Sequence, residues 1–347
     1  MKQMADPAEF ETGLPAGDEE GGLRPLTLAE FNGQSEIKEK LSIYMQAARL
    51  RGEPLDHTLF YGPPGLGKTT LSGIIAHEMG GSLRVTTGPA LEKPGDLAAI
   101  LTSLQDGDVL FIDEIHRMSI STEEVLYSAM EDFSIHLIVG KGPLARNVTV
   151  PMPKFTLVGA TTRLGLLSSP LRARFGIVEQ LRLYDELELC QILQRGAGLL
   201  NVSASSEGLR AIARRSRGTP RVALRLLRRV RDVADVTGQA QIDEALVSQA
   251  MDMLGLDDRG FNAGDRRIIT TVVELFSGGP VGLSTIAAAL NEEPQTIEDI
   301  YEPYLIQQGM IERTPRGRKA TEKAYEYLGL PVPQPENDEA QRLLDLE

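Results

Sequence analysis

A glycine-rich loop constrains the fold of this chain more than any other feature. The segment "FYGPPGLGKTT", residues 60–70, has an apolar β-type start, a loop of glycines and prolines, and a helical continuation. Gly62, Gly67, Lys68 and Thr69 match the pattern G-x-x-x-x-G-K-[ST], in which backbone N–H groups converge on phosphate oxygens. The positive end of the following helix strengthens that attraction. This phosphate-binding loop (P-loop) therefore predicts an α/β domain that binds a nucleotide.

The P-loop is expected to supply most of the contacts with ATP and Mg²⁺. We expect Lys68 to reach the β- and γ-phosphates and the Thr69 hydroxyl to ligate the magnesium ion. The other nucleotide-binding residues predicted in the loop are Gly62, Pro63, Pro64, Gly65, Leu66, Gly67 and Thr70. A chance match in an ordinary Gly-Pro loop is disfavoured, because a β-type run precedes this loop and a helical pattern follows it.

A second motif, "DVLFIDEIHR", is an apolar strand that ends in Asp113 and Glu114. Parallel sheets bind ligands at the carboxyl ends of their strands, so Asp113 can complete the magnesium site and Glu114 can polarise the attacking water. Two acids after a strand can also belong to a solvated loop, and the P-loop upstream favours the catalytic interpretation. We expect the neighbouring His116 and Arg117 to be exposed surface residues.

A third apolar strand, "FTLVGATTR", ends in Thr161, Thr162 and Arg163. The Thr162 hydroxyl is the preferred candidate to orient the water or to contact the γ-phosphate. The alternative is that these threonines only end a strand, where β-branched residues are common. The two preceding motifs favour the catalytic role for Thr162.

Charge and composition bound the location and the partners of the chain. The 347 residues carry a net charge of −13, of which residues 1–22 contribute −5 and residues 331–347 contribute −4. Both ends are predicted to be disordered acidic tails, so the body between them can still carry basic patches for DNA. No apolar run is long enough to cross a membrane and no signal peptide is recognisable, which predicts a cytoplasmic protein without a membrane partner. The single cysteine, Cys190, excludes an internal disulfide.

Three domains are predicted between the tails. Residues 23–184 alternate β-type runs with helical patterns, which indicates an α/β domain around a parallel sheet. Residues 185–256 lack strand signals and contain amphipathic helical patterns, which predicts a small helical lid domain. Residues 257–330 combine short helices with a hairpin-like stretch, which is typical of a winged-helix domain.

The third predicted domain supplies the argument for DNA binding. Its second helix, "QTIEDIYEPYLIQQ", is acidic and includes Glu302, so phosphates would repel it from the major groove. The basic residues gather on the wing instead, at Arg313, Arg316, Arg318 and Lys319. We therefore expect Arg313, Arg316 and Arg318 to contact the backbone of duplex DNA without reading bases. The alternative is a winged-helix domain that contacts only proteins.

Five segments together resemble the AAA+ ATPases and, among them, the RuvB family of branch-migration motors. They are "GPPGLGKT", "DEIHR", "GATTR", "LRARFG" and "RGTPR", in this order along the chain. The resemblance covers about residues 23–330, and the combination is more specific than any single motif. It implies an ATP-driven homohexameric ring on duplex DNA that moves Holliday junctions together with the partners RuvA and RuvC.

The resemblance assigns two sensors of the nucleotide state. Thr162 corresponds to the first sensor, and Arg221, after Pro220, corresponds to the second sensor on the helical lid. An arginine at a helix start after Gly-Thr-Pro can contact the γ-phosphate and report its loss as a lid rotation. Arg221 can also be one member of an arginine-rich helix face, and its position favours the nucleotide role.

The resemblance also assigns the adenine pocket and a catalytic arginine. It places Tyr184 and the segment "LRPLTLAEFNGQ", residues 23–34, with Leu23 and Arg24, near the adenine. Chemistry alone makes Tyr184 an ordinary half-buried aromatic residue. In "LSSPLRARFG", Arg174 corresponds to a finger that reaches the γ-phosphate held by a neighbouring subunit. This segment follows the third strand, so we expect it at the domain edge, too far from its own P-loop to serve the same phosphate.

Residues 134–151 are predicted to form a β-hairpin with apolar residues at alternate positions. Ile135, Leu137, Val148 and Val150 are therefore expected to share a face that must be buried somewhere. Packing on their own domain is one interpretation. The resemblance favours the other, in which the hairpin projects and docks RuvA, since exposed apolar patches commonly mark partner surfaces.

Other classes of ATP-binding protein remain as alternatives. A clamp-loader subunit also uses ATP and a finger arginine, but it would usually end in a helical collar rather than a winged-helix pattern. A protein-unfolding motor threads polypeptide on an aromatic pore loop, and residues 82–107 contain no aromatic residue. A nucleotide-gated DNA-binding initiator is expected to read bases with its recognition helix, and here that helix is acidic.

Overall fold

The computed structural model describes residues 21–139 and 146–333. The chain divides into two compact units, residues 1–247 and 248–347, and each is described below by itself. The turn of the predicted hairpin falls outside the described residues, as do the predicted acidic tails apart from residues 21–22 and 331–333. Within the described ranges, no helix is long and apolar enough to cross a membrane.

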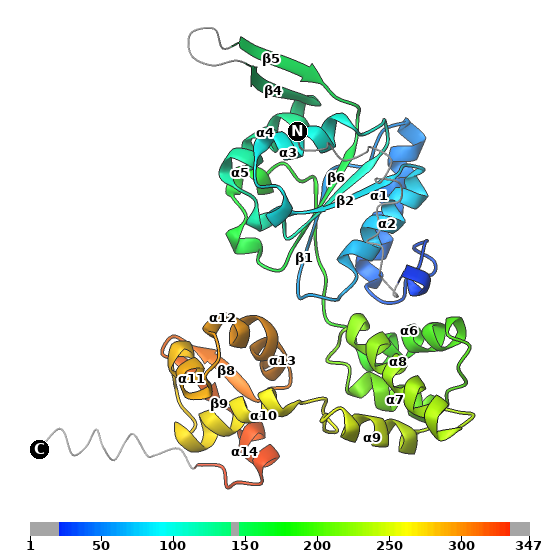
Figure 1. Ribbon diagram of the computed structural model, residues 1–347. Coiled ribbons are helices and arrows are strands. Elements are labelled where there is room, and N and C mark those ends of the chain that lie inside the picture. Colours follow the sequence, from blue (N-terminus) through cyan, green and yellow to red (C-terminus); the bar gives the residue numbers. More distant parts are fainter. Residues whose placement is uncertain (1–20, 140–145, 334–347) are drawn as a thin grey trace, which may run out of the picture. The chain divides into compact units, whose positions relative to one another are not determined.

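A five-stranded parallel sheet forms the centre of the first unit, in the order β2-β3-β6-β1-β7 (Figure 1). The strands are β1 (Thr58–Tyr61), β2 (Leu83–Thr87), β3 (Val109–Asp113), β6 (Thr156–Thr161) and β7 (Ile177–Gln180). The three central strands are the three apolar runs predicted from the sequence, and nearly all of their residues are buried. Because they are parallel, their carboxyl ends bring the three motifs to one edge of the sheet.

Helices cover both faces of this sheet. Figure 1 shows α1 and α2 on one face and α3, α4 and α5 on the other. Their bounds are α1 Ser35–Arg51, α2 Lys68–Met79, α3 Pro94–Thr102, α4 Ile120–Asp132 and α5 Ser169–Arg172, with 3-10 turns at Gly21–Leu23, Gly88–Ala90, Ile115–Arg117 and Leu164–Leu166. The core beneath α3 and α4 contains the fully buried side chains of Leu126, Phe155 and Leu157.

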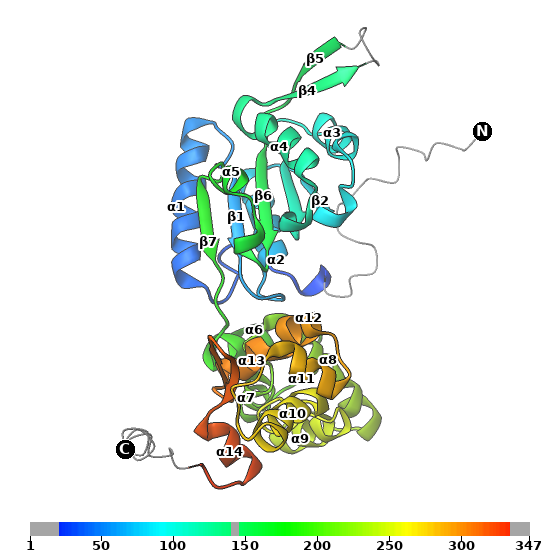
Figure 2. The same cartoon turned by 90° about the vertical axis from the view of Figure 1, so that its left-hand side faces the viewer.

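An antiparallel hairpin leaves the sheet domain directly after α4. Its strands are β4 (Ser134–Val139) and β5 (Arg146–Pro151). Ile135 pairs with Val150, and Leu137 pairs with Val148. Both views show the hairpin projecting beyond α4 (Figures 1 and 2). The predicted hairpin is therefore confirmed in its two strands.

The helical pattern after the sheet folds as a small group of helices. These are α6 (Glu186–Leu199), α7 (Ser206–Arg214), α8 (Pro220–Thr237) and α9 (Glu244–Met253). α8 has a proline in its first turn and is closed by Gly238, whose φ is 69°. Its buried face includes Leu227 and Val230 and packs against α6 and α7.

The second unit contains the predicted helix-turn-helix and wing. Its helices are α10 Ala263–Thr270, α11 Leu283–Leu290, α12 Pro294–Thr296, α13 Glu302–Gln307 and α14 Glu322–Leu328, and π-helical turns at Thr271–Leu275 and Ile297–Tyr301 follow α10 and join α12 to α13. The wing consists of β8 (Ile311–Thr314) and β9 (Gly317–Ala320). Fully buried Phe261, Ile269 and Leu305 lie in the core of this unit.

Candidate nucleotide-binding site and its associated surfaces

The P-loop connects the end of β1 to the first residue of α2. Gly62, Gly65 and Gly67 all have positive φ, a conformation that other residues rarely adopt. A side chain on Gly65 would place its Cβ 2.7 Å from the methyl carbon of Thr219, at the start of α8. Glycine at this position therefore lets the lid helix approach the loop closely.

Lys68 is buried at the base of the P-loop. Its ammonium group donates hydrogen bonds of 2.8 Å to the carbonyl oxygens of Gly62 and of the next residue. Burial lowers the pKa of Lys68 below its usual value, the carboxylates of Asp113 and Glu114 oppose that shift, and the positive charge of Arg221 adds to it. These four charged side chains are thus close enough to interact beside the loop that would hold the phosphates.

The acidic pair and the third strand meet at the same edge of the sheet. Asp113 ends β3, and Glu114 follows it with a positive φ of 49°. The Glu114 backbone N–H donates a 3.0 Å hydrogen bond to Asp113 Oδ1, and the Thr162 hydroxyl donates one of 3.4 Å to Glu114 Oε2. The structure therefore brings three of the predicted catalytic residues together from the ends of two neighbouring strands.

His116 contradicts the prediction that both residues after this motif are exposed. Its side chain is only 7% exposed, and its Nδ1 lies 2.8 Å from the Thr161 hydroxyl and 3.4 Å from Glu114 Oε2. The prediction is wrong because the 3-10 turn Ile115–Arg117 folds back against β6, a tertiary contact that sequence order does not reveal. Arg117 itself is exposed.

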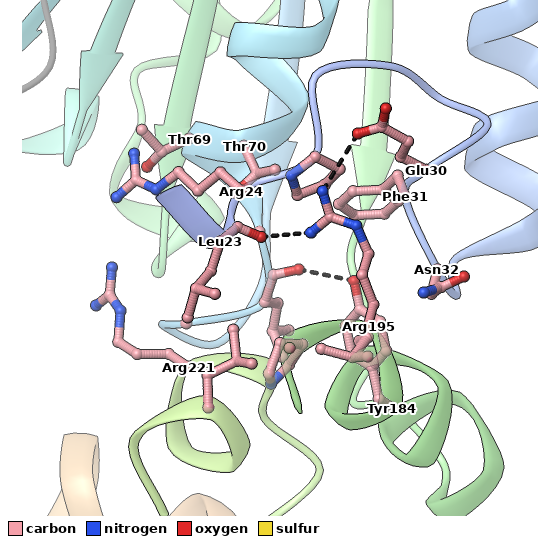
Figure 3. A pocket seen from close by; sticks show the side chains of 18 of the residues that line it. Leu23, Arg24, Glu30, Phe31, Asn32, Thr69, Thr70, Tyr184, Arg195 and Arg221 are labelled. Carbon is pink, nitrogen blue, oxygen red and sulfur yellow. Dashed lines mark hydrogen bonds and ion pairs between the residues drawn. The ribbon is translucent and has the colours of Figure 1, made fainter. Parts of the chain in front are cut away.

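A pocket lies beside the P-loop (Figure 3). Its lining includes Leu23, Arg24 and Tyr184, together with residues 65–70. Tyr184 is buried rather than half-buried, and its hydroxyl donates a 3.0 Å hydrogen bond to the Leu66 carbonyl oxygen. Burial raises the pKa of Tyr184, so the phenol stays neutral and ties this wall of the pocket to the P-loop.

Two further segments complete the pocket, of which the first lies within the predicted adenine-pocket segment, residues 23–34, and the second was not predicted from the sequence. Phe31 and Asn32 come from the chain before α1, and Arg195 comes from α6. Figure 3 shows Arg195 donating to the Leu23 carbonyl oxygen, at 2.5 Å, and pairing with Glu30 at 3.2 Å. In the sequence Arg195 is one arginine of an amphipathic helix, so only the fold shows that it holds the segment around Leu23.

The lid contributes Pro220 and Arg221 to the same pocket. The Arg221 backbone N–H donates a 3.4 Å hydrogen bond to the Gly65 carbonyl oxygen, and the Tyr184 N–H donates one of 2.8 Å to Gly218. The side chain of Arg221 is exposed. The start of α8 and an exposed arginine therefore lie beside the P-loop.

Thr69 and Asp113 are the predicted magnesium ligands, and both offer oxygen atoms. Thr69 lies in the first turn of α2, and Asp113 lies at the carboxyl end of β3. The part of the chain that the structure describes has no group of three or more His, Cys, Asp or Glu able to hold a metal ion by itself. This sparse oxygen set fits Mg²⁺, which usually takes one or two protein ligands and completes its shell with water and nucleotide phosphates.

Comparison with known proteins assigns the chain to a family. The Holliday junction DNA helicase RuvB P-loop domain matches residues 23–181, the RuvB AAA lid domain matches residues 184–257, and the RuvB C-terminal winged helix domain matches residues 258–329. The chain belongs to the RuvB family. The predicted fold class, a P-loop α/β domain followed by a helical lid and a winged-helix domain, is confirmed.

RuvB relatives match along most of the chain. The subunits named Holliday junction branch migration complex subunit RuvB from Pediococcus pentosaceus and Thermomicrobium roseum are 57% and 59% identical to it; both matches cover 90% of this chain, and they cover 93% and 88% of the relatives. The solved Thermotoga maritima RuvB Holliday junction branch migration motor is 52% identical, with a TM-score of 0.82 over 90% of this chain and 100% of that one.

In this RuvB-family chain, the predicted finger Arg174 lies outside the lining of the nucleotide pocket. Its guanidinium donates a 2.8 Å hydrogen bond to the Pro170 carbonyl oxygen and pairs with Glu131 at 3.0 Å. Arg172, two residues earlier, is exposed. The negative charge that Arg174 meets within its own subunit is therefore a carboxylate of α4.

The three wing arginines differ in what they offer to a ligand. Arg313 and Arg318 both pair with Glu302, at 2.6 and 2.9 Å, and the Glu302 side chain is fully buried. Glu302 is thus hidden inside the winged-helix domain, which corrects the expectation that its charge contributes to repelling DNA phosphates. Arg318 is only 17% exposed, whereas Arg316 at the tip of the wing is exposed. Arg316 is therefore the most available of the three predicted DNA contacts.

The hairpin residues also differ in their availability. Ile135 is fully buried and Val150 is partly buried, and both pack with the core of the α/β domain. The prediction of partner contact is therefore wrong for Ile135, because the base of the hairpin packs on its own domain. Val148 is 41% exposed, and the side chain of Leu137 lies outside the described part of the structure.

Proposed function

We propose that this chain is the ATP-hydrolysing subunit of a ring that moves duplex DNA and thereby drives branch migration of Holliday junctions. The observation that carries the proposal is the pocket lined by both the P-loop and the start of the lid helix, with Lys68 in its wall under the influence of the carboxylates of Asp113 and Glu114. Membership of the RuvB family makes the chain an AAA+ ATPase. The relatives named as branch-migration subunits and the winged-helix domain support DNA as the moved substrate.

The hydrolytic step follows from the groups at the sheet edge. Bound through Thr69 and Asp113, Mg²⁺ would neutralise charge on the β- and γ-phosphates. Lys68 would exchange its two loop carbonyl contacts for phosphate oxygens. Glu114 would orient and polarise the attacking water, and the Thr162 hydroxyl would hold the Glu114 carboxylate or the water in place.

The lid would convert hydrolysis into movement. Arg221 would contact the γ-phosphate, so that loss of this phosphate removes an anion from the start of α8 and favours a new lid angle. We place the ATPase domain at residues 23–184, the lid at 185–256 and the DNA-binding domain at 257–330. Because the lid precedes the DNA-binding domain in the chain, its rotation would be passed on to the bound duplex.

Assembly would complete the motor. We propose a homohexamer in which Arg174 of one subunit reaches the γ-phosphate bound to its neighbour. The wing would contact the duplex backbone mainly through Arg316, with Arg313 and Arg318 nearby. RuvA would dock on the projecting hairpin, where Val148 is exposed, and RuvC would act in the same complex.

Branch movement in a synthetic four-way junction tests this proposal. With RuvA, ATP and Mg²⁺ present, the wild-type chain should move the junction, and Lys68→Ala should not. Lys154→Ala, which removes an exposed lysine of the same domain, should retain movement. No movement above background by the wild type, or equal movement by Lys68→Ala, would refute the proposed motor.

A further inference from the structure

We infer that Tyr127 and Glu131 of α4 form a resting site for Arg174 within its own subunit, which the guanidinium must leave before it acts on a neighbour. The inference rests on the proposed role of Arg174 as a finger in trans. Tyr127 and Glu131 are then positioning residues, because they act through Arg174 and lie outside the lining of the nucleotide pocket.

α4 presents a polar stripe to the segment that carries Arg174. Glu123, Tyr127 and Glu131 are each four residues apart, so they share one face of the helix. The Tyr127 hydroxyl donates a 2.9 Å hydrogen bond to Glu123, and the Ser168 hydroxyl donates one of 2.6 Å to the same carboxylate. Ser168 caps the start of α5, so this stripe fixes the short helix that precedes Arg174.

The guanidinium of Arg174 is engaged on three sides. Its carbon atom lies 4.5 Å from the centre of the Tyr127 ring, its Nη2 pairs with Glu131 Oε1 at 3.0 Å, and its Nη1 donates to the Pro170 carbonyl oxygen. The whole side chain is 22% exposed. In this position one contact of each terminal nitrogen is already taken and one face of the guanidinium is covered by Tyr127, so full bidentate contact with a phosphate of another subunit requires Arg174 to give up these partners.

The resting site holds Arg174 reversibly. Glu131 is 56% exposed, so water competes for its ion pair with the guanidinium. The Arg174 Nε is buried without a hydrogen-bond partner, which leaves one donor unsatisfied in this position. A γ-phosphate offers charged oxygens in a bidentate geometry, so it can draw the guanidinium away. The resting site would therefore keep Arg174 ordered while it is not bound to a neighbour's γ-phosphate. It would also compete with the γ-phosphate for the guanidinium.

Fluorescence can follow the departure of Arg174 directly. The chain contains no tryptophan, so Tyr127→Trp supplies a single reporter beneath the guanidinium. Its emission should differ between the Arg174 and Arg174→Ala backgrounds, because a stacked cation perturbs the indole ring. Assembly of full-length subunits on duplex DNA with Mg²⁺ and a non-hydrolysable ATP analogue should shift the spectrum toward that of Arg174→Ala. Identical spectra in both backgrounds, or no shift on assembly, would overturn the resting site.

Hydrolysis by the assembled ring provides a second readout. Glu131→Gln should raise the DNA-stimulated turnover rate about two- to fivefold, the factor expected for loss of one exposed ion pair, with KM for ATP unchanged. Tyr127→Leu should act in the same direction, and Tyr127→Phe, which keeps the ring, should change the rate less. Glu124→Gln makes the same charge change about two turns earlier on α4 and is the matched control.

The outcomes separate the resting site from the finger itself. If Arg174→Ala retains hydrolysis, the proposed finger is wrong. If Arg174→Ala is inactive but Glu131→Gln turns over at the rate of Glu124→Gln, the finger stands and the resting site is refuted. Equal effects of Tyr127→Phe and Tyr127→Leu would also refute it, because the ring contact would then play no part.

Discussion

Lys68 shows, at the scale of a single residue, how the free site is prepared for an anion. Burial lowers its pKa, and in the free loop its ammonium group donates to two carbonyl oxygens. A bound triphosphate would replace those neutral partners with negative charges and so raise the pKa of Lys68 in the complex. Above the lowered pKa of the free state, ATP binding would therefore require proton uptake by Lys68.

ATP affinity should consequently fall as the pH rises through the interval between these two pKa values. Below this pH interval Lys68 is charged with and without ATP, so its titration does not affect ATP affinity. Within the interval, free Lys68 is increasingly deprotonated as the pH rises, and the proton it must take up to bind ATP becomes harder to obtain. The Kd of a non-hydrolysable ATP analogue, measured from about pH 7 to about pH 10, reports the effect. Lys68→Arg keeps its charge throughout this pH range, so its Kd should change less with pH than that of the wild type. Equal pH dependence of Kd in the two proteins would contradict proton uptake by Lys68.

Residue positions were predictable from the sequence where geometry is local. The P-loop places its glycines, Lys68 and Thr69 by spacing alone, because all of them belong to one strand-loop-helix unit. His116 and Arg195 could not be assigned in this way. His116 acquires its environment from a turn that folds onto β6, and Arg195 acquires its partners from a segment far away in the chain.

At the scale of elements, one buried carboxylate fastens the wing to the helix-turn-helix. Glu302 begins α13, while Arg313 and Arg318 come from β8 and β9. The fully buried Glu302 pairs with both arginines, so charged side chains of three elements meet at one point. The acidic helix is therefore not uniformly repelled by DNA, because part of its charge is neutralised inside the domain.

Glu302→Gln should destabilise the winged-helix domain by about 2 kcal/mol, since it removes the carboxylate from two arginines that keep some access to water. Urea unfolding, read by hydrogen exchange in β8 and β9, would measure the loss. Glu298 provides the control, because it is 36% exposed and lies 3.5 and 4.0 Å from the same arginines. Glu298→Gln should cost under about 0.5 kcal/mol, and equal losses in the two variants would argue against a buried anchor.

Arg316→Ala should weaken duplex binding about equally for all sequences and reduce the salt dependence of binding by about one unit of slope. The physical reason is that an exposed wing-tip arginine would neutralise a phosphate rather than read a base. Titration of several duplexes at different salt concentrations measures both quantities. Lys323→Ala, an exposed lysine on α14, is the control, and a sequence-selective loss in Arg316→Ala would contradict backbone contact.

The buried strands of the sheet were easier to predict from the sequence than the partly exposed ones. β1, β3 and β6 are continuous apolar runs because they are covered on both faces. The edge strands β2 and β7 are not: β2 is only partly buried, and β7 alternates buried and exposed residues, so their sequences give no such run. The alternating hairpin was also predictable, but alternation could not show that Ile135 packs on its own domain.

At the scale of the whole molecule, the positions of the charges explain why each chain would need a neighbour. The pocket gathers Lys68 and Arg221 beside the carboxylates of its own sheet edge, while Arg174 lies outside it and pairs with Glu131. In the proposed ring, each subunit would supply its own nucleotide pocket and one arginine for the pocket of its neighbour. No sequence pattern could reveal the pair with Glu131, because α4 and the segment after α5 meet only in the fold.

The most direct test of this account is the ATPase activity of mixed rings made from Lys68→Ala and Arg174→Ala subunits. Each variant alone should be inactive, and Arg174→Ala should still bind ATP. A mixture should regain turnover, because some interfaces then join an intact P-loop from one subunit to an intact Arg174 from the next. Recovery in mixed rings, with ring composition and subunit number measured by native mass spectrometry, is the predicted result. No recovery despite mixed rings would contradict catalysis shared between subunits.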